Sequence, residues 1–177
     1  NTSAALTAGN SSTAVANAQA GLVLDATGKQ QFYASGDFAL SVPGVASVTG
    51  TATSSRNTST SEVAARSIVV DGLTVNMPTL PASSQSFVAD AQFNLNNLIS
   101  VSGILAAEVV SQPLQLHDGS SVDARLLKLG GAGINGFVGL NGPASNSTAT
   151  GLNVTGLEFG LVSATSLADP ARQWTAA

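Results

Sequence analysis

Residues 87–109, FVADAQFNLNNLISVSGILAAEV, alternate between apolar and polar side chains over most of their length, with the apolar ones at odd positions. Successive side chains of a β-strand point to opposite faces, so this pattern gives one apolar and one polar face. A helix would need apolar residues at spacings of three and four. The stretch therefore predicts extended β-structure, either one long bent strand or two strands with a corner at Asn96-Asn97 or at Gly103.

The same alternation recurs in both directions from this stretch, over residues 32–42, 46–53 and 152–162, and Pro43-Gly44 separates the first two segments. Turns rich in Gly, Pro and Asp-Gly favour hairpins over crossover helices. We therefore expect an all-β, mainly antiparallel fold, either a two-sheet sandwich or a flattened, elongated β-solenoid, with little or no helix. The pattern predicts this buried set: Phe32, Phe38, Leu40, Val48, Val69, Phe87, Phe93, Leu95, Ile99, Val101, Leu105, Phe137, Leu157, Phe159 and Leu161.

The composition is apolar but almost uncharged. Hydrophobic residues make up 44% of the 177 residues and charged ones only 9%, against about 25% charged in typical soluble domains. A surface of hydroxyl and amide groups repels itself weakly. Such a surface suits a protein that lies beside copies of itself or beside adjacent repeats of the same chain.

Several function classes are disfavoured by what the chain lacks. Its six Lys and Arg residues are scattered, whereas nucleic-acid binding needs clustered cations, so no nucleic-acid partner is expected. No apolar window is long enough for a transmembrane helix. The chain has no cysteine and one histidine, which excludes disulfides and cysteine–zinc sites and leaves little for catalysis. We expect no enzyme activity and no catalytic or cofactor-binding residues.

Metal binding has one weak candidate, in the segment from His117 to Asp123, HDGSSVD. Asp118 and Asp123 offer carboxylate oxygens, the ligands that calcium prefers. The segment lacks the twelve-residue loop with a closing glutamate. We expect a polar hairpin turn here with an exposed His117, and keep calcium on Asp118 and Asp123 as the alternative.

The organisation predicted is one β-rich domain over residues 21–177, preceded by residues 1–20, which are a linker or an edge strand completed by a neighbour. The chain also carries a weak internal regularity. Val48-Thr49-Gly50, Val101-Ser102-Gly103 and Val154-Thr155-Gly156 are each 53 residues apart. A period near 50 residues falls in the range of repeat architectures.

Short phrases of the chain resemble the tandem β-rich repeats of giant secreted bacterial surface proteins of the adhesin-like kind. They are Phe32–Gly36, Val42–Val45, Arg56–Thr58, Val69–Val75, Leu95–Gly103 and Gly156–Val162. The resemblance implies an extracellular or cell-surface location and a structural or adhesive role, without catalytic residues. The chain lacks the aspartate-bearing glycine nonapeptide of calcium-loaded repeats.

Two functions follow as expectations. The first is a structural repeat unit of an extracellular bacterial fibre, sheath or giant adhesin that self-associates through β-strand edges. The alternative is a carbohydrate- or surface-binding β-sandwich of an adhesin, with cell-surface glycans as partners.

Overall fold

The computed structural model describes residues 2–176 and contains, within them, eleven β-strands and no helix. The strands are β1 (Thr2–Ala8), β2 (Ser11–Leu24), β3 (Gln30–Val42), β4 (Ala46–Asn57), β5 (Arg66–Val70), β6 (Leu73–Met77), β7 (Ser84–Leu95), β8 (Ile99–Gln115), β9 (Ser121–Leu140), β10 (Thr150–Ser166) and β11 (Gln173–Ala176). The all-β, antiparallel prediction is confirmed.

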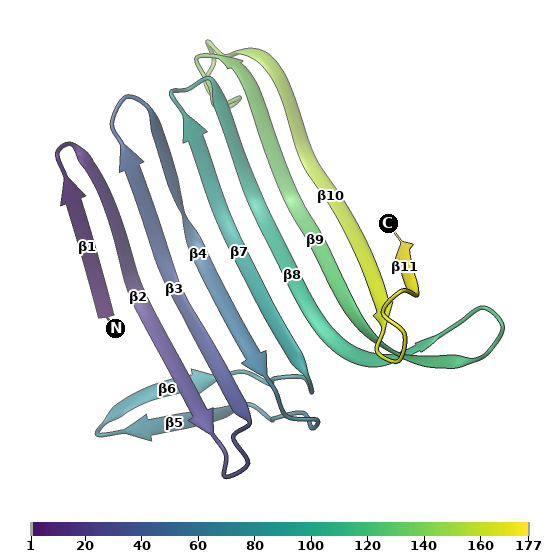
Figure 1. Ribbon diagram of the computed structural model, residues 1–177. Coiled ribbons are helices and arrows are strands. Elements are labelled where there is room, and N and C mark those ends of the chain that lie inside the picture. Colours follow the sequence, from purple (N-terminus) through teal and green to yellow (C-terminus); the bar gives the residue numbers. More distant parts are fainter. Residues whose placement is uncertain (1, 177) are drawn as a thin grey trace.

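Nine of these strands form a single sheet in the order β1-β2-β3-β4-β7-β8-β9-β10-β11, in which every neighbouring pair is antiparallel. Strands β5 and β6 form a separate hairpin between β4 and β7. The two sheets are thus very unequal in size, and Figure 1 shows the large one as a broad, twisted and largely uncovered surface. Strands β1 and β11 lie at its opposite edges.

The corner within the opening stretch is at Asn96-Asn97. Strand β7 ends at Leu95 and β8 begins at Ile99, and both asparagines have positive φ, 45° and 57°. Asparagine tolerates this conformation better than most residues, and it suits a tight hairpin turn. The other candidate, Gly103, lies inside β8 at a register shift between Ser102 and Ile104.

Residues opposite each other in antiparallel strands share a face, so the register defines an apolar face and a polar face. One row of paired residues, here called the upper row, crosses the apolar face from β1 to β10. It consists of Leu6, Thr13, Leu40, Val48, Phe93, Val101, Gly136 and Val154. The three tripeptides 53 residues apart thus place their valines at one level of the sheet.

A second row, the lower row, crosses the same face nearer the middle of the strands. It consists of Thr2, Ala18, Gly36, Ala52, Ala89, Leu105, Gly131 and Phe159, with Gly36 lying beside Ala18 at a bulge. The β-bulges of β2, β9 and β10 all fall between the two rows, at Ala16/Gln19, Ala132/Asn135 and Val154/Leu157. Because the extra residues lie at one level, the apolar alternation stays on one face above and below them.

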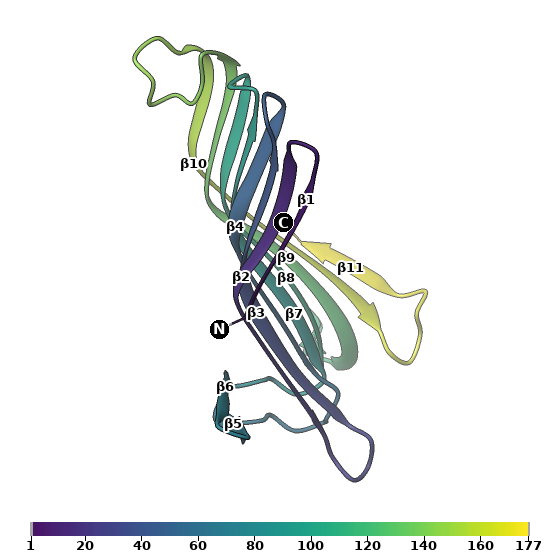
Figure 2. The same ribbon diagram turned by 90° about the vertical axis from the view of Figure 1, so that its left-hand side faces the viewer.

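The predicted buried set is mostly wrong. Of its members only Phe137 is buried, with 3% of its surface exposed, and Val69, Leu105 and Leu157 are 65%, 51% and 49% exposed. The alternation identified the correct apolar face, but no layer of comparable size covers that face among the described residues. The buried core lies instead on the polar face where β8–β11 curl together (Figure 2), and it contains Val110, Ala124, Leu126 and Ala164, flanked by Leu114 and Trp174.

A second buried cluster holds the β5–β6 hairpin against the sheet. Asn57, 1% exposed, donates from Nδ2 to the carbonyl oxygens of Ser61, Leu80 and Pro81 at 2.9, 3.1 and 3.0 Å. Leu80 is 1% exposed. The hairpin reaches β2 at Gly21, where a Cβ atom would lie 3.1 Å from Val75. These contacts fix the hairpin on the polar face without covering the apolar one.

The single-layer architecture leaves an unusually large surface. The protein exposes 10978 Å². A compact monomer of 17.5 kDa exposes about 7,900 Å², so the excess is about 3,000 Å². That excess is comparable to the total area buried in a large protein–protein interface.

Candidate functional site

The apolar face is the largest candidate surface. Leu152, Leu105 and Phe159 on it are 70%, 51% and 48% exposed. Monomeric soluble proteins rarely expose contiguous apolar patches above a few hundred Å². A face of this extent is typical of a protein that packs against another molecule.

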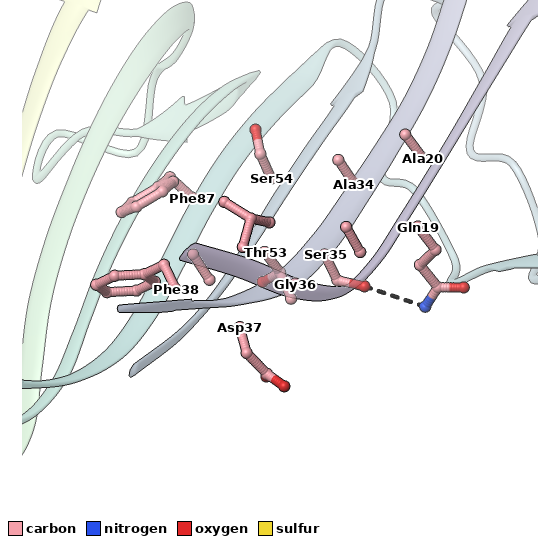
Figure 3. Close-up of a pocket in the computed structure, with 13 residues that line it drawn as sticks. Gln19, Ala20, Ala34, Ser35, Gly36, Asp37, Phe38, Thr53, Ser54 and Phe87 are labelled. Atoms are coloured by element: carbon pink, nitrogen blue, oxygen red, sulfur yellow. Dashed lines mark hydrogen bonds between the residues drawn. The ribbon is translucent and has the colours of Figure 1, made fainter. Parts of the chain in front are cut away.

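A shallow hollow of about 540 Å³ lies on this face over β2, β3 and β4. Small residues such as Ala34 and Gly36 form its floor, and Phe38 and Phe87 flank it. In Figure 3, Asp37 points to the opposite side of the sheet from Phe87. Sugar recognition requires several convergent polar groups, and this hollow is predominantly apolar.

The polar face carries the paired charges. Lys128 Nζ lies 2.9 Å from Glu108 Oε2, a pair of neighbours on β9 and β8. Asp37 accepts a hydrogen bond of 2.6 Å from Asn17 Nδ2 at the β2 bulge. Gln19 Nε2 donates to Ser35 Oγ at 3.0 Å, as Figure 3 also shows. These side chains are paired within the sheet and mark this face as the one suited to water.

One edge of the sheet is open along most of β10. Strand β11 pairs only with Val162–Thr165, so among the described residues no strand pairs with the outer side of residues 150–161. Every residue from 150 to 160 is exposed. Natural edge strands are usually protected by Pro, Lys or short length. Residues 150–161, TGLNVTGLEFGL, contain no Pro or Lys and one charge, Glu158.

The opposite edge is open as well. Strand β1 pairs with β2 between Ser11 and Ala18, and its outer side has no partner strand within residues 2–176. Its sequence, TSAALTA, contains neither a charge nor a proline, and residues 3–8 are exposed. Within the part of the chain that the structure describes, residues 19–24 of β2, beyond the end of β1, are also without a neighbouring strand on that side. The sequence left residues 1–20 open between a linker and an edge strand completed by a neighbour, and it did not single out β10, although the alternation of β10 was visible.

The calcium candidates are at separate positions in the β8–β9 hairpin. Asp118 lies in the turn, where its Oδ1 accepts hydrogen bonds from Ser120 N and Oγ at 2.9 and 2.6 Å. The hydrogen bond from the Ser120 hydroxyl is the main reason that the pKa of Asp118 lies below its ordinary value. Asp123 lies in β9 opposite Pro113, and His117 is exposed beside the turn. Within residues 2–176, no three His, Asp or Glu residues gather in a group suited to a metal ion.

The described part of the chain contains no helix long and apolar enough to cross a membrane. The fold and its surfaces define a class, an all-β protein built on one open antiparallel sheet. No protein-family model matches the chain, and searches of curated proteins and of solved structures give no significant match.

Proposed function

We propose that this chain is a structural unit of an extracellular bacterial fibre, sheath or giant adhesin, and that it self-associates through the edges of its sheet. The observation that carries the proposal is the open stretch of β10, residues 150–161, whose outer backbone groups have no partner strand among the described residues. Each unpaired N–H and C=O group along such an edge favours the addition of another strand.

The composition supports the same function. A chain with 9% charged residues opposes close approach of its copies only weakly. The apolar face adds a second surface on which assembled sheets would pack, since face-to-face packing of sheets buries their apolar sides at a spacing of about 10 Å. The resemblance to adhesin-like repeats supplies the extracellular setting.

The proposal is tested by following the purified chain over a wide concentration range with analytical ultracentrifugation and negative-stain electron microscopy. We expect growth into open, extended assemblies. A chain that stays monomeric at every concentration would overturn self-association. Antibody labelling of intact cells that produce the protein tests the location, and labelling only after permeabilisation would overturn the extracellular part.

The carbohydrate-binding alternative depends on the hollow over β2–β4. Its floor of Ala and Gly residues offers little for hydrogen bonding to sugar hydroxyls. A glycan-array signal that disappears in Phe38→Ser and Phe87→Ser variants would favour this alternative over the structural one.

A further inference from the structure

The outermost strand at each edge of the sheet is shorter than the strand beside it. The two short strands lie toward opposite ends of the sheet, so the two edges have complementary outlines. On one side, β11 occupies the lower part of β10, and no strand of the described residues pairs with the outer side of residues 150–161. On the other side, β1 occupies the upper part of β2, and none of the described strands pairs with the outer side of residues 19–24. Figure 1 shows β1 along the upper half of its edge and β11 near the lower end of the opposite edge.

We propose that two copies of this chain join edge to edge, with β1 of one copy pairing with the open residues 150–161 of β10 of the other. This inference rests on the proposed function and assigns its strands, direction and register. In the joined pair, β1 lies end to end with the neighbour's β11 along β10. This arrangement also places that β11 beside residues 19–24 of β2 in the copy that supplies β1.

The strand directions agree with this joint. The sheet has nine strands and every neighbouring pair is antiparallel, so β1 and β11, the first and the ninth, run in the same direction. An incoming β1 in the orientation of a continued sheet is therefore parallel to β11 and antiparallel to β10. Antiparallel pairing is the arrangement used throughout this sheet.

The two rows fix the register. The upper row ends at Leu6 on one edge and Val154 on the other, and the lower row ends at Thr2 and Phe159. Placing Leu6 opposite Val154 and Thr2 opposite Phe159 continues both rows at once. The rows are five residues apart on β10 and four apart on β1. The β10 bulge between Val154 and Leu157 takes up this difference, as the bulge of β9 does where β9 pairs with β8.

The backbone groups also match at this register. Ser166 N donates to Arg172 O at 3.1 Å, so Ser166 directs its backbone N–H and C=O groups toward the outer side of β10. This direction alternates along a strand, so the other even-numbered residues up the strand to Glu158 direct their groups outward as well. On β1, Ala8 and Ser11 flank the two-residue turn Gly9-Asn10. In a two-residue hairpin the flanking residues hydrogen-bond to each other across the strands, so Ala8 and every second residue before it direct their backbone groups toward β2. The residues between them, Ser3 included, direct their backbone N–H and C=O groups outward. The register places Ser3 opposite Glu158.

A joint of this kind uses two different edges, so each added copy presents the same open edge again. Such heterologous association gives an open ribbon unless the rotation between copies closes it. It also keeps the apolar faces of successive copies on one side, because Leu6 and Val154 both belong to the apolar face.

Cysteine cross-linking tests the joint, since the chain contains no cysteine of its own. An Ala4→Cys variant is mixed with a Leu157→Cys variant under mild oxidation, because the register makes these residues neighbours on the apolar face. We expect a heterodimeric disulfide. Leu152→Cys, on the same strand at a higher level, and Val45→Cys, in the β3–β4 turn, are the controls and should cross-link poorly to Ala4→Cys. Preferential Ala4→Cys homodimers, or equal yields with the controls, would overturn the joint.

A backbone substitution gives an independent measurement. Ser3→Pro removes the outward N–H while leaving the bonds from β1 to β2 in place, so we expect assembly about tenfold weaker. Ser3→Thr keeps the N–H and should assemble like the parent chain. If the parent assembles and Ser3→Pro assembles equally well, the joint is overturned while edge association by another route survives. If the parent never assembles, the proposed function fails together with the joint.

Discussion

Phe159 on β10 lies over Gly131 on β9, and the two form a cross-strand pair on the apolar face. A Cβ atom at position 131 would overlap Cε1 of that ring and would lie 2.6 Å from Cδ1 of Ile134. The glycine therefore makes room for the phenylalanine, a pairing that holds aromatic rings flat against sheets.

This pairing predicts different effects for two glycines of the same strand and face. Gly131→Val should destabilise the protein by about 1–3 kcal/mol, because the ring must move. Gly136→Val is the control, since no atom of the described residues beyond its chain neighbours lies within 4 Å of its Cβ position, and it should be neutral or slightly stabilising. Urea unfolding followed by circular dichroism measures both. Equal losses would contradict the packing of Phe159.

The location of the core predicts opposite outcomes for adjacent leucines. Leu126 is 4% exposed on the polar face, and Leu127 is 40% exposed on the apolar face. Leu126→Asp buries an unpaired charge and should cost more than about 4 kcal/mol, enough to prevent folding. Leu127→Asp should cost less than about 1 kcal/mol. Soluble yield and thermal unfolding check this, and a folded Leu126→Asp variant would show that the core lies elsewhere.

Asn57 predicts a local effect on the β5–β6 hairpin. Asn57→Ala removes the Nδ2 donor to the carbonyl of Ser61, while the carbonyl of Leu80 keeps its bond from Val63 N. We expect a loss of about 1–3 kcal/mol. The hairpin should become sensitive to proteases before the large sheet does. Asn76→Ala, which removes an exposed hydrogen bond to Ser67, is the control. Limited proteolysis with mass spectrometry identifies the first cleavage, and cleavage first within β7–β10 would contradict the expectation.

The β2–β3 turn predicts a pH dependence. Asp25 Oδ1 accepts hydrogen bonds from the hydroxyl and N–H of Thr27 at 2.7 and 2.8 Å and from Lys29 N at 2.9 Å. The bond from the Thr27 hydroxyl is the largest cause that lowers the pKa of Asp25 below 3.8. A lowered folded-state pKa means that the ionised group contributes stability above the unfolded pKa. That contribution is lost as the pH falls through the folded value.

Carboxyl-detected NMR titration of Asp25 measures this effect. In a Thr27→Val variant, the pKa of Asp25 should rise towards its ordinary value because the hydroxyl donor is gone. Thr7→Val, at a distance from this turn in the sequence, serves as the control. An unchanged Asp25 titration in Thr27→Val would contradict the role of the hydroxyl.

The strands could be predicted from the sequence because alternation is a local property. The pattern around Phe93 and the asparagine pair 96–97 together define β7, its turn and β8. Burial could not be predicted in the same way. Alternation shows which face is apolar, but what covers that face depends on the rest of the molecule, and for Leu105 no covering layer is present among the described residues.

The open edges were only partly predictable. The low apolar content of residues 1–20 suggested a linker or an edge strand, but residues 150–161 alternate as strongly as the central strands do. A strand lies at an edge when the series of hairpins ends there. The local sequence around Leu152 or Val154 does not encode where the series ends. One feature of the sequence pointed to the rows, namely the spacing of 53 residues between the matching tripeptides. In the structure their valines, Val48, Val101 and Val154, lie at the same level of the sheet.

The meander order has a consequence for how the protein folds and unfolds. Each long strand pairs only with its immediate neighbours in the sheet, so cooperativity is transmitted from one ladder to the next, as in repeat proteins. We therefore expect fraying to begin at β1 and β11 and to proceed inward in steps. A neighbouring copy at either edge would suppress that fraying, so thermal resistance would rise with the length of the ribbon.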